Sequence, residues 1–284
     1  MATTLFDLGP TGRPDRVIPP PVKLDRHGPA RIIAMCNQKG GVGKTTSTIN
    51  LAAALARYGR RVLAIDFDPQ GALSAGLGVP AHDVPTIYDL MLGKEKDPHQ
   101  AIQRTGTPGL VVIPANIDLS AAEVHLVTEV AREQILSGVL RKVVDDYDVV
   151  LIDCQPSLGL LTVNALTASH GVLIPLACEY FALRGVALLV ETVEKVKDRL
   201  NPALELDGIL ATMYDSRTLH AREVLERVVD TFGDTVFETV IGRTVKLPDA
   251  QIAAKPILDY APSNAASEAY LRLARELVQR GAVA

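Results

Sequence analysis

The stretch Lys39–Thr46, which reads KGGVGKTT, contains the residue types that bind phosphate. It follows a strand-like apolar run and precedes a helical one, which is the context of a P-loop. Lys44 is expected to reach the β- and γ-phosphates of a nucleotide, and the Thr45 hydroxyl to bind Mg²⁺. Three glycines let the backbone curl so that N–H groups face phosphate oxygens: Gly40, Gly41 and Gly43.

The loop departs from the usual GxxxxGK[ST] pattern in two ways. Asn37 or Gln38, depending on the alignment, takes the place of the first glycine, and a second lysine, Lys39, precedes the remaining glycines. The alternative interpretation is a glycine-rich turn that binds nothing.

Polar residues follow several other apolar runs. Carboxylates end three of these runs at Asp66–Asp68, Asp153 and Asp215, and Asn37 ends another. Because ligands of parallel sheets bind at the carboxyl ends of the strands, these residues are expected to share one site. The alternative for each carboxylate is a cap on the next helix or turn.

The elements that position these residues alternate between strand and helix. Continuous apolar runs are expected of strands covered on both faces. We therefore predict an α/β fold of the P-loop NTPase type, with a mostly parallel, doubly wound sheet and helices on both faces. The predicted strands are residues 31–37, 61–68, 110–116, 147–154, 171–178, 206–215 and 235–242. The predicted helices are 44–58, 129–144, 183–200, 219–231 and 264–280.

Residues 1–29 differ from the rest, with six of the 18 prolines. We predict a disordered, proline-rich leader, followed by a single domain over residues 30–284. The alternative is a tether that docks on a partner or on the protein's own surface.

Composition gives few further indications of function. The net charge of -4 does not indicate nucleic acid, so DNA binding would need a local patch. The three cysteines, Cys36, Cys154 and Cys178, form no CxxC pair and are predicted to be buried, reduced thiols. Since the sequence contains no signal peptide or apolar span, we expect a cytoplasmic protein.

The chain after the leader resembles the ParA/MinD superfamily, and specifically its ParA/Soj branch. KGGVGKTT resembles the deviant Walker A loop, whose first lysine is the signature. The resemblance continues in NQKGGVGKTTSTINLAAALA, RVLAIDFDPQGALSAGLGV, YDVVLIDCQPSLGLLTVNAL and GILATMYDSRT. It implies an ATPase that binds ATP and Mg²⁺, forms a homodimer in the ATP state and hydrolyses ATP slowly.

The resemblance also implies roles for individual residues. Lys39 would cross the dimer interface to the other subunit's phosphates, and Asp68 would position or activate the attacking water. Catalysis would involve Lys39, Lys44, Asp68 and Asp153. The nucleotide would contact Lys39, Gly40, Gly41, Val42, Gly43, Lys44, Thr45 and Thr46, with the adenine near Met213 and Asp249. Magnesium would lie near Thr45, Asp66 and Asp153. The two carboxylates would approach the metal through water.

Two stretches depart from the family pattern. Gln155 stands in DCQPS where the branch commonly has DxPPS, and it is expected to hold a water or to relax a turn. The segment Pro248–Pro256 lacks the family's Glu and PSFG residues, which weakens the inference for Asp249.

The resemblance further implies nonspecific DNA binding by the ATP-bound dimer, nucleoid association and a ParB-like activator. The corresponding DNA contacts would be Arg217, Arg222, Arg243 and Lys246. However, Tyr214–Tyr260 holds six Lys/Arg against eight Asp/Glu, so a solvated helix face of mixed charge is the alternative.

Other functions remain open within the superfamily. An orphan ParA-like regulator of cell division or cargo positioning would keep the ATP switch without segregation. A MinD-like switch would lie on a membrane through a basic C-terminal helix, but the last segment has few basic residues and is expected to be core. An iron–sulfur carrier would need paired cysteines, and a polysaccharide-associated tyrosine kinase would need a tyrosine-rich tail. This sequence contains neither paired cysteines nor such a tail.

Overall fold

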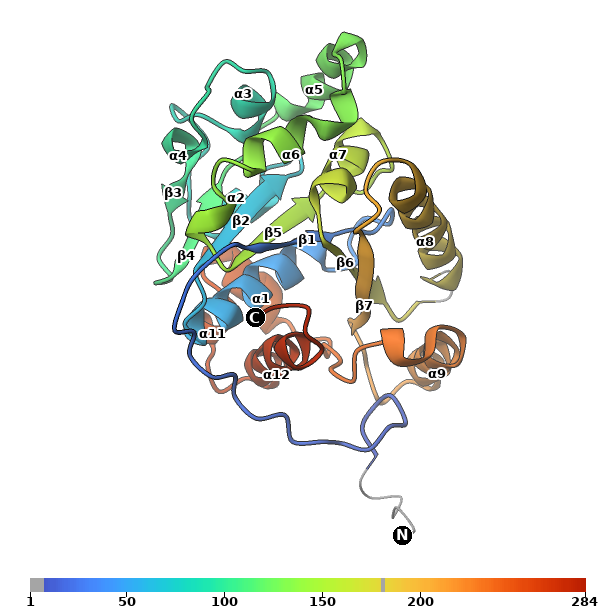
Figure 1. Ribbon diagram of the computed structural model, residues 1–284. Helices are drawn as coiled ribbons and strands as arrows, with labels where there is room; N and C mark the ends of the chain where they lie inside the picture. Colours follow the sequence, from blue (N-terminus) through green and yellow to red (C-terminus); the bar gives the residue numbers. More distant parts are fainter. Residues whose placement is uncertain (1–7, 180–181) are drawn as a thin grey trace.

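The computed structural model describes residues 8–179 and 182–284, and within them the chain forms one seven-stranded sheet (Figure 1). The strand order is β3-β4-β2-β5-β1-β6-β7. All neighbours are parallel except β3 and β4. The strands are β1 Arg31–Met35, β2 Val62–Phe67, β3 Gln103–Arg104, β4 Leu110–Ile113, β5 Val149–Cys154, β6 Gly171–Ala177 and β7 Glu205–Thr212.

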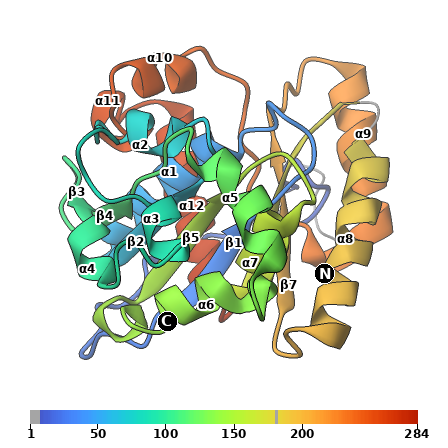
Figure 2. The ribbon, with the colours of Figure 1, turned by 90° about the horizontal axis from the view of Figure 1, so that it is seen from above.

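Helices cover both faces of this sheet and create two separate cores. The longer helices are α1 Lys44–Arg57, α7 Leu160–Ala168, α8 Ala182–Arg199, α9 Leu219–Phe232 and α12 Ala265–Gln279. Figure 2 shows α8 and α9 beside β7 at one end, with β3 and β4 at the other. One core contains side chains of α1 and α12, and the other those of α7, α8 and α9. The predicted doubly wound α/β fold is therefore confirmed.

Shorter helices connect these elements. They are α2 Ala72–Gly76, α3 Ile87–Met91, α4 Pro98–Ala101, α5 Leu119–His125, α6 Ile135–Leu140, α10 Lys246–Ile252 and α11 Ile257–Tyr260. Of them only α6 lies within a helix predicted from the sequence, the one over residues 129–144. No described helix is long and apolar enough to cross a membrane.

The predicted strand over residues 235–242 is wrong. The segment runs beside β7 but forms only two isolated bridges, Ile209 with Val236 and Tyr214 with Gly242. Between them, the carboxylate of Glu276 on α12 accepts the backbone N–H groups of Glu238 (2.7 Å) and Thr239 (2.9 Å). Because these N–H groups bond to a side chain, the pairing of the segment with β7 is interrupted.

The predicted helix over residues 129–144 is also wrong in extent. Only α6 is α-helical there, flanked by short 3₁₀ turns at 132–134 and 144–146. Ala131 has a φ of 54°, a left-handed conformation that no residue within an α-helix adopts. The helix therefore starts only after this position.

The described part of the leader, residues 8–29, contacts the domain at several points. Gly28 N–H and His27 Nδ1 contact the Asp148 carboxylate at 3.0 and 2.8 Å, and Arg60 donates to the Val22 carbonyl at 2.8 Å. Nearer the N-terminus, Asp15 forms an ion pair with Arg272 of α12 at 2.6 Å. This docked segment spans from the start of β1 to the outer side of α12.

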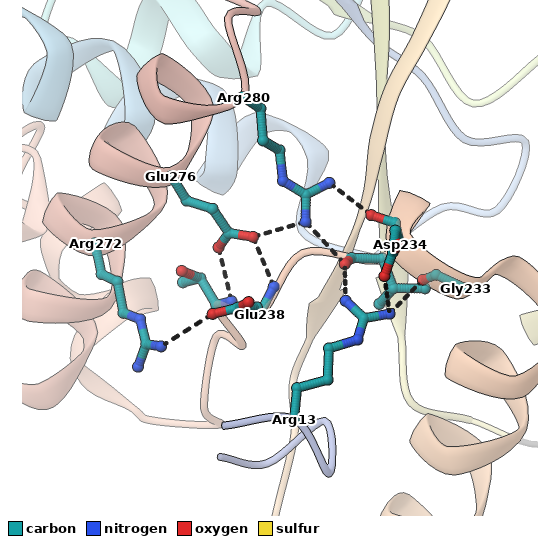
Figure 3. A network of polar contacts seen from close by, with 9 residues as sticks. Arg13, Gly233, Asp234, Glu238, Arg272, Glu276 and Arg280 are labelled. Atoms are coloured by element: carbon teal, nitrogen blue, oxygen red, sulfur yellow. Dashed lines mark hydrogen bonds and ion pairs between the residues drawn. The ribbon is translucent and has the colours of Figure 1, made fainter. Parts of the chain in front are cut away.

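Arg13 makes the most extensive contact of the docked segment (Figure 3). Its guanidinium donates to the carbonyls of Val236 (2.9 Å) and Gly233. Arg280, the C-cap of α12, donates to the same Val236 carbonyl at 2.9 Å and to Glu276 at 2.8 Å. The leader thus joins the network that holds the segment after α9 against α12.

Replacing Arg13 by alanine tests this docking. Arg13→Ala removes two bonds from a charged donor, so we expect a loss of about 1–2 kcal/mol in the free energy of unfolding. Arg16→Ala is the matched control, because this exposed arginine has no hydrogen bond among the described residues; it should cost at most about 0.5 kcal/mol. Equal values for the two variants in a urea titration would show that the leader is not docked.

Candidate nucleotide-binding site

The phosphate loop connects the end of β1 to the start of α1. Gly41 and Gly43 have φ angles of 73° and 82°, which residues with a Cβ rarely adopt. Gly43 is the N-cap of α1 and provides no side-chain cap, so the first N–H groups of α1 remain available to an anion. The predicted P-loop geometry is therefore present.

Two hydrogen bonds fasten this loop to neighbouring strands, and a third lies within the loop. The Asn37 amide donates to the Pro175 carbonyl of β6 at 2.7 Å, and Asn37 Oδ1 accepts the Lys39 N–H at 2.9 Å. The Thr212 hydroxyl, at the end of β7, donates to the Val42 carbonyl at 2.9 Å. Sequence reasoning missed Thr212, because an ordinary threonine at a strand end carries no distinctive pattern.

The two lysines of the loop have different environments. Lys44 is only 7% exposed, and its ammonium donates to the Lys39 carbonyl at 3.1 Å. Burial lowers the pKa of Lys44, while the negative charge of Asp153 opposes that shift. Lys39 has a half-exposed side chain, which forms an ion pair with the exposed carboxylate of Glu179. Lys44 thus lies within the phosphate loop, whereas Lys39 lies at its outer surface.

Asp153 ends β5 and is fully buried. Its carboxylate accepts the hydroxyls of Thr45 (2.7 Å) and Thr48 (3.1 Å) from the first turns of α1. Burial and the charge of Asp66 raise the pKa of Asp153 to about 7. Sequence reasoning paired Thr45 with Asp153 through a common metal, and the structure places the two side chains in direct contact.

Asp66 lies opposite Asp153 on the neighbouring strand β2 and is also fully buried. Its carboxylate accepts both the N–H (2.8 Å) and the hydroxyl (2.6 Å) of Ser74 in α2. Burial raises the pKa of Asp66 to about 6. Ser74 was not predicted, since its distance along the sequence gives no indication of this contact.

These groups fit magnesium in the way expected for a nucleotide site. Two adjacent buried carboxylates repel each other, so a cation between or beside them would relieve the repulsion. Mg²⁺ keeps several waters and binds one or two protein ligands together with substrate phosphates. Among the described residues no cluster of three or more His, Cys, Asp or Glu side chains could hold a metal alone. Thr45 and Asp153 are the side chains best placed to hold it.

Asp68 lies just beyond the end of β2 and is partly exposed. Its carboxylate accepts the Gln70 N–H at 3.0 Å, and its negative charge acts on the Lys44 ammonium. Asp68 is thus close enough to the phosphate loop for an electrostatic effect, while its partly exposed position leaves it accessible to water.

The two residues expected near adenine lie on different elements. Met213 follows β7 directly, with a φ of 52° and a 40% exposed side chain. Since the preceding Thr212 bonds to the phosphate loop, Met213 is close to that loop. Asp249 lies on α10 and forms a 3.5 Å ion pair with Lys246, one turn away. Met213 thus follows a residue bonded to the phosphate loop, whereas the contact of Asp249 is with Lys246 on its own helix.

Three of the basic residues expected to contact DNA, Arg217, Arg222 and Arg243, lie near the end of β7, whereas Lys246 lies on α10. Arg217 holds the Asp215 carboxylate with two bonds of 2.8 and 2.7 Å, which lowers the pKa of Asp215 to about 2. The charge of Arg243 also acts on Asp215, and that of Arg222 acts on the preceding Tyr214. Arg222 and Arg243 are exposed, whereas Arg217 is already paired.

The buried carboxyl pair predicts a pH dependence of stability. Because the folded pKa values exceed the usual value of 3.8, the native state binds more protons than the unfolded chain between about pH 4 and pH 7. Stability without nucleotide and Mg²⁺ therefore falls as the pH rises through this range. Asp153→Asn removes the repulsion, so the variant should have a higher melting temperature than the wild type. This difference should be about 5 °C larger at about pH 7.5 than at about pH 5.

The control for this measurement is Asp249→Asn, which removes a partly exposed carboxylate outside the pair. Its melting temperature should follow that of the wild type at every pH. Parallel profiles for Asp153→Asn and the wild type in differential scanning calorimetry would contradict the proposed repulsion.

Comparison with known proteins agrees with this geometry. The model of a family described as "AAA domain" matches residues 30–206. The chromosome-partitioning ATPase Soj of Treponema pallidum is 50% identical over 250 residues, covering 88% of this chain and 98% of Soj. An uncharacterized protein of Mycobacterium tuberculosis is 58% identical over 274 residues, covering 96% of this chain and 86% of that protein.

A similar solved structure contains nucleotide and metal. It is a crystal structure described as cobyrinic acid a,c-diamide synthase from Mycobacterium smegmatis with bound ADP and magnesium, with a TM-score of 0.78 and 41% identity. The similarity covers 89% of this chain and 95% of that one. The same protein has also been crystallised with an ATP analog and magnesium, with a TM-score of 0.78 and 41% identity, so the similar structures hold nucleotide and Mg²⁺ in this fold. The matched domain, the identity to Soj and the paired lysines of the phosphate loop agree: the chain belongs to the Soj/ParA family of partitioning ATPases.

Proposed function

We propose that the protein is an ATP-dependent dimerising switch that positions DNA or another cellular cargo. The observation that carries this proposal is the different placement of two lysines on one loop. Lys44 is buried beside the expected phosphates, whereas Lys39 lies outside with only an exposed carboxylate as its partner. An exposed ion pair is weak, so Lys39 can exchange Glu179 for the phosphates of a second copy at little cost.

The residues of the site support slow hydrolysis of ATP. The N–H groups of the loop and the Lys44 ammonium would bind the phosphates and balance their charge. Magnesium, when bound, would neutralise charge that develops on the phosphate oxygens. Asp68 would orient the attacking water, since its carboxylate is accessible and its charge reaches Lys44. Asp153 would fix the Thr45 hydroxyl on the metal side of the site.

Dimerisation would connect this chemistry to a partner. In the ATP state two copies would face each other through their phosphate loops, with Lys39 of each copy on the other's nucleotide. The dimer would bind DNA without sequence preference through Arg222 and Arg243, with Arg217 and Lys246 at the edges of the same surface. A ParB-like protein would stimulate hydrolysis and release the dimer from the nucleoid.

Amidation of a corrinoid acid, suggested by the name of the Mycobacterium smegmatis protein, is less well supported. Its identity to this chain is 41%, against 50% for Soj. Release of ammonia from glutamine commonly uses an accessible cysteine nucleophile. All three cysteines of this chain are buried, so none is available for that step.

DNA co-sedimentation with ADP, with ATP, and with ATP and the Asp68→Ala variant tests the proposal. Binding should appear only with ATP, persist in the variant because hydrolysis is blocked, and weaken as salt rises. Arg222→Glu combined with Arg243→Glu should abolish binding, while Glu226→Gln on the exposed face of α9 should not reduce it.

Two results would overturn the proposal in different ways. Absence of DNA binding in every nucleotide state, with ATP-driven dimers still present, would exclude DNA as the partner. Equal DNA binding with ADP and with ATP would exclude the switch.

A further inference from the structure

Gln155 connects three parts of the site. It lies two residues after Asp153, and its backbone N–H donates to the Phe67 carbonyl at the end of β2, at 3.3 Å. Phe67 is the residue before Asp68. The side-chain amide of Gln155 donates to Glu123 Oε1 on α5 at 3.1 Å. The backbone of Gln155 is therefore tied to the Asp68 strand and its side chain to α5.

Glu123 has a second contact that explains why its carboxylate is held in place. The same Oε1 lies 3.5 Å from the Leu161 N–H in the first turn of α7. Gly159, the N-cap of α7, has no side chain to cap this helix, and a Cβ there would lie 2.1 Å from Glu123 Oε1. Glu123 thus supplies the negative charge that the N-terminus of α7 otherwise lacks.

We propose that Gln155 and Glu123 form a positioning pair for the hydrolysis of ATP. By holding residues 155–159 between α5 and α7, the pair keeps the ends of β2 and β5 in register where Asp68 and Asp153 act. This inference rests on the proposed ATPase function. Neither side chain belongs to the phosphate loop, so the pair affects the reaction geometry rather than nucleotide binding.

The chemistry of residue 155 supports this assignment. A proline there would lack the N–H that bonds to Phe67 and the amide that bonds to Glu123, and would restrict the loop through its ring instead. This chain uses two hydrogen bonds for that restriction. One amide N–H of Gln155 is directed to Glu123, so its side chain is held against α5.

Steady-state kinetics of the full-length protein test the pair. Gln155→Ala and Glu123→Ala should each lower kcat by about three- to tenfold and change KM by less than about twofold. The double variant should be no slower than the slower single variant, since both changes remove the same contact. Glu123→Gln should keep nearly the full kcat, because its amide oxygen can accept from both Gln155 and Leu161.

The matched control is Glu129→Ala, an exposed acidic residue just beyond α5, which should leave kcat unchanged. Three results would each overturn the pair. They are full kcat in both alanine variants, strictly additive losses of kcat in the double variant, and a Glu123→Gln variant as slow as Glu123→Ala. A wild-type protein that neither binds nor hydrolyses ATP would instead contradict the proposed function.

Hydrogen exchange tests the pair even where turnover is too slow to measure. Amides of residues 155–161 should exchange about five- to tenfold faster in Glu123→Ala than in the wild type, as expected when one hydrogen bond to a charged group is lost. Glu123→Gln should restore most of the protection. Unchanged exchange in Glu123→Ala would overturn the inference.

Discussion

Two carboxylates, Asp66 and Asp153, lie opposite each other on neighbouring strands, buried with no exposed surface. Burying these charged groups is unfavourable: burial raises the pKa of Asp66 to about 6, and burial together with the charge of Asp66 raises the pKa of Asp153 to about 7. Hydrogen bonds offset part of this cost: Ser74 donates to Asp66, and two threonine hydroxyls donate to Asp153. A site built in this way favours a divalent cation, and it therefore couples metal and nucleotide binding to the stability of the sheet.

The elements around this pair are fastened from several directions. Residues of β6 and β7 hold the phosphate loop, and Glu123 and Gln155 hold the loop after β5. On the opposite side, the docked leader and α12 hold the segment that follows α9. Catalysis of the proposed kind depends on close positioning of the reacting groups, which a rigid scaffold provides, whereas Lys39 lies at the surface with an exchangeable partner.

The sequence predicted the fold well, because continuous apolar runs are local signals, and the glycine loop could be located for the same reason. It failed where a distant side chain decides the local structure. Glu276 interrupts the predicted strand over 235–242 by accepting two of its N–H groups. Ser74 and Glu123 were missed for the same reason, since each acts through a contact formed only on folding. The docking of the leader likewise depends on carbonyls more than 200 residues away.

The central claim is that Lys39 makes dimerisation depend on ATP. Sedimentation equilibrium of Asp68→Ala with Mg²⁺ and ATP, compared with Asp68→Ala combined with Lys39→Ala, tests it most directly. Our account predicts twice the 30.4 kDa mass of the chain for the first protein and the monomer mass for the second, although both still bind ATP. A dimer that forms equally well without Lys39, or a monomer at saturating ATP in both proteins, would contradict it.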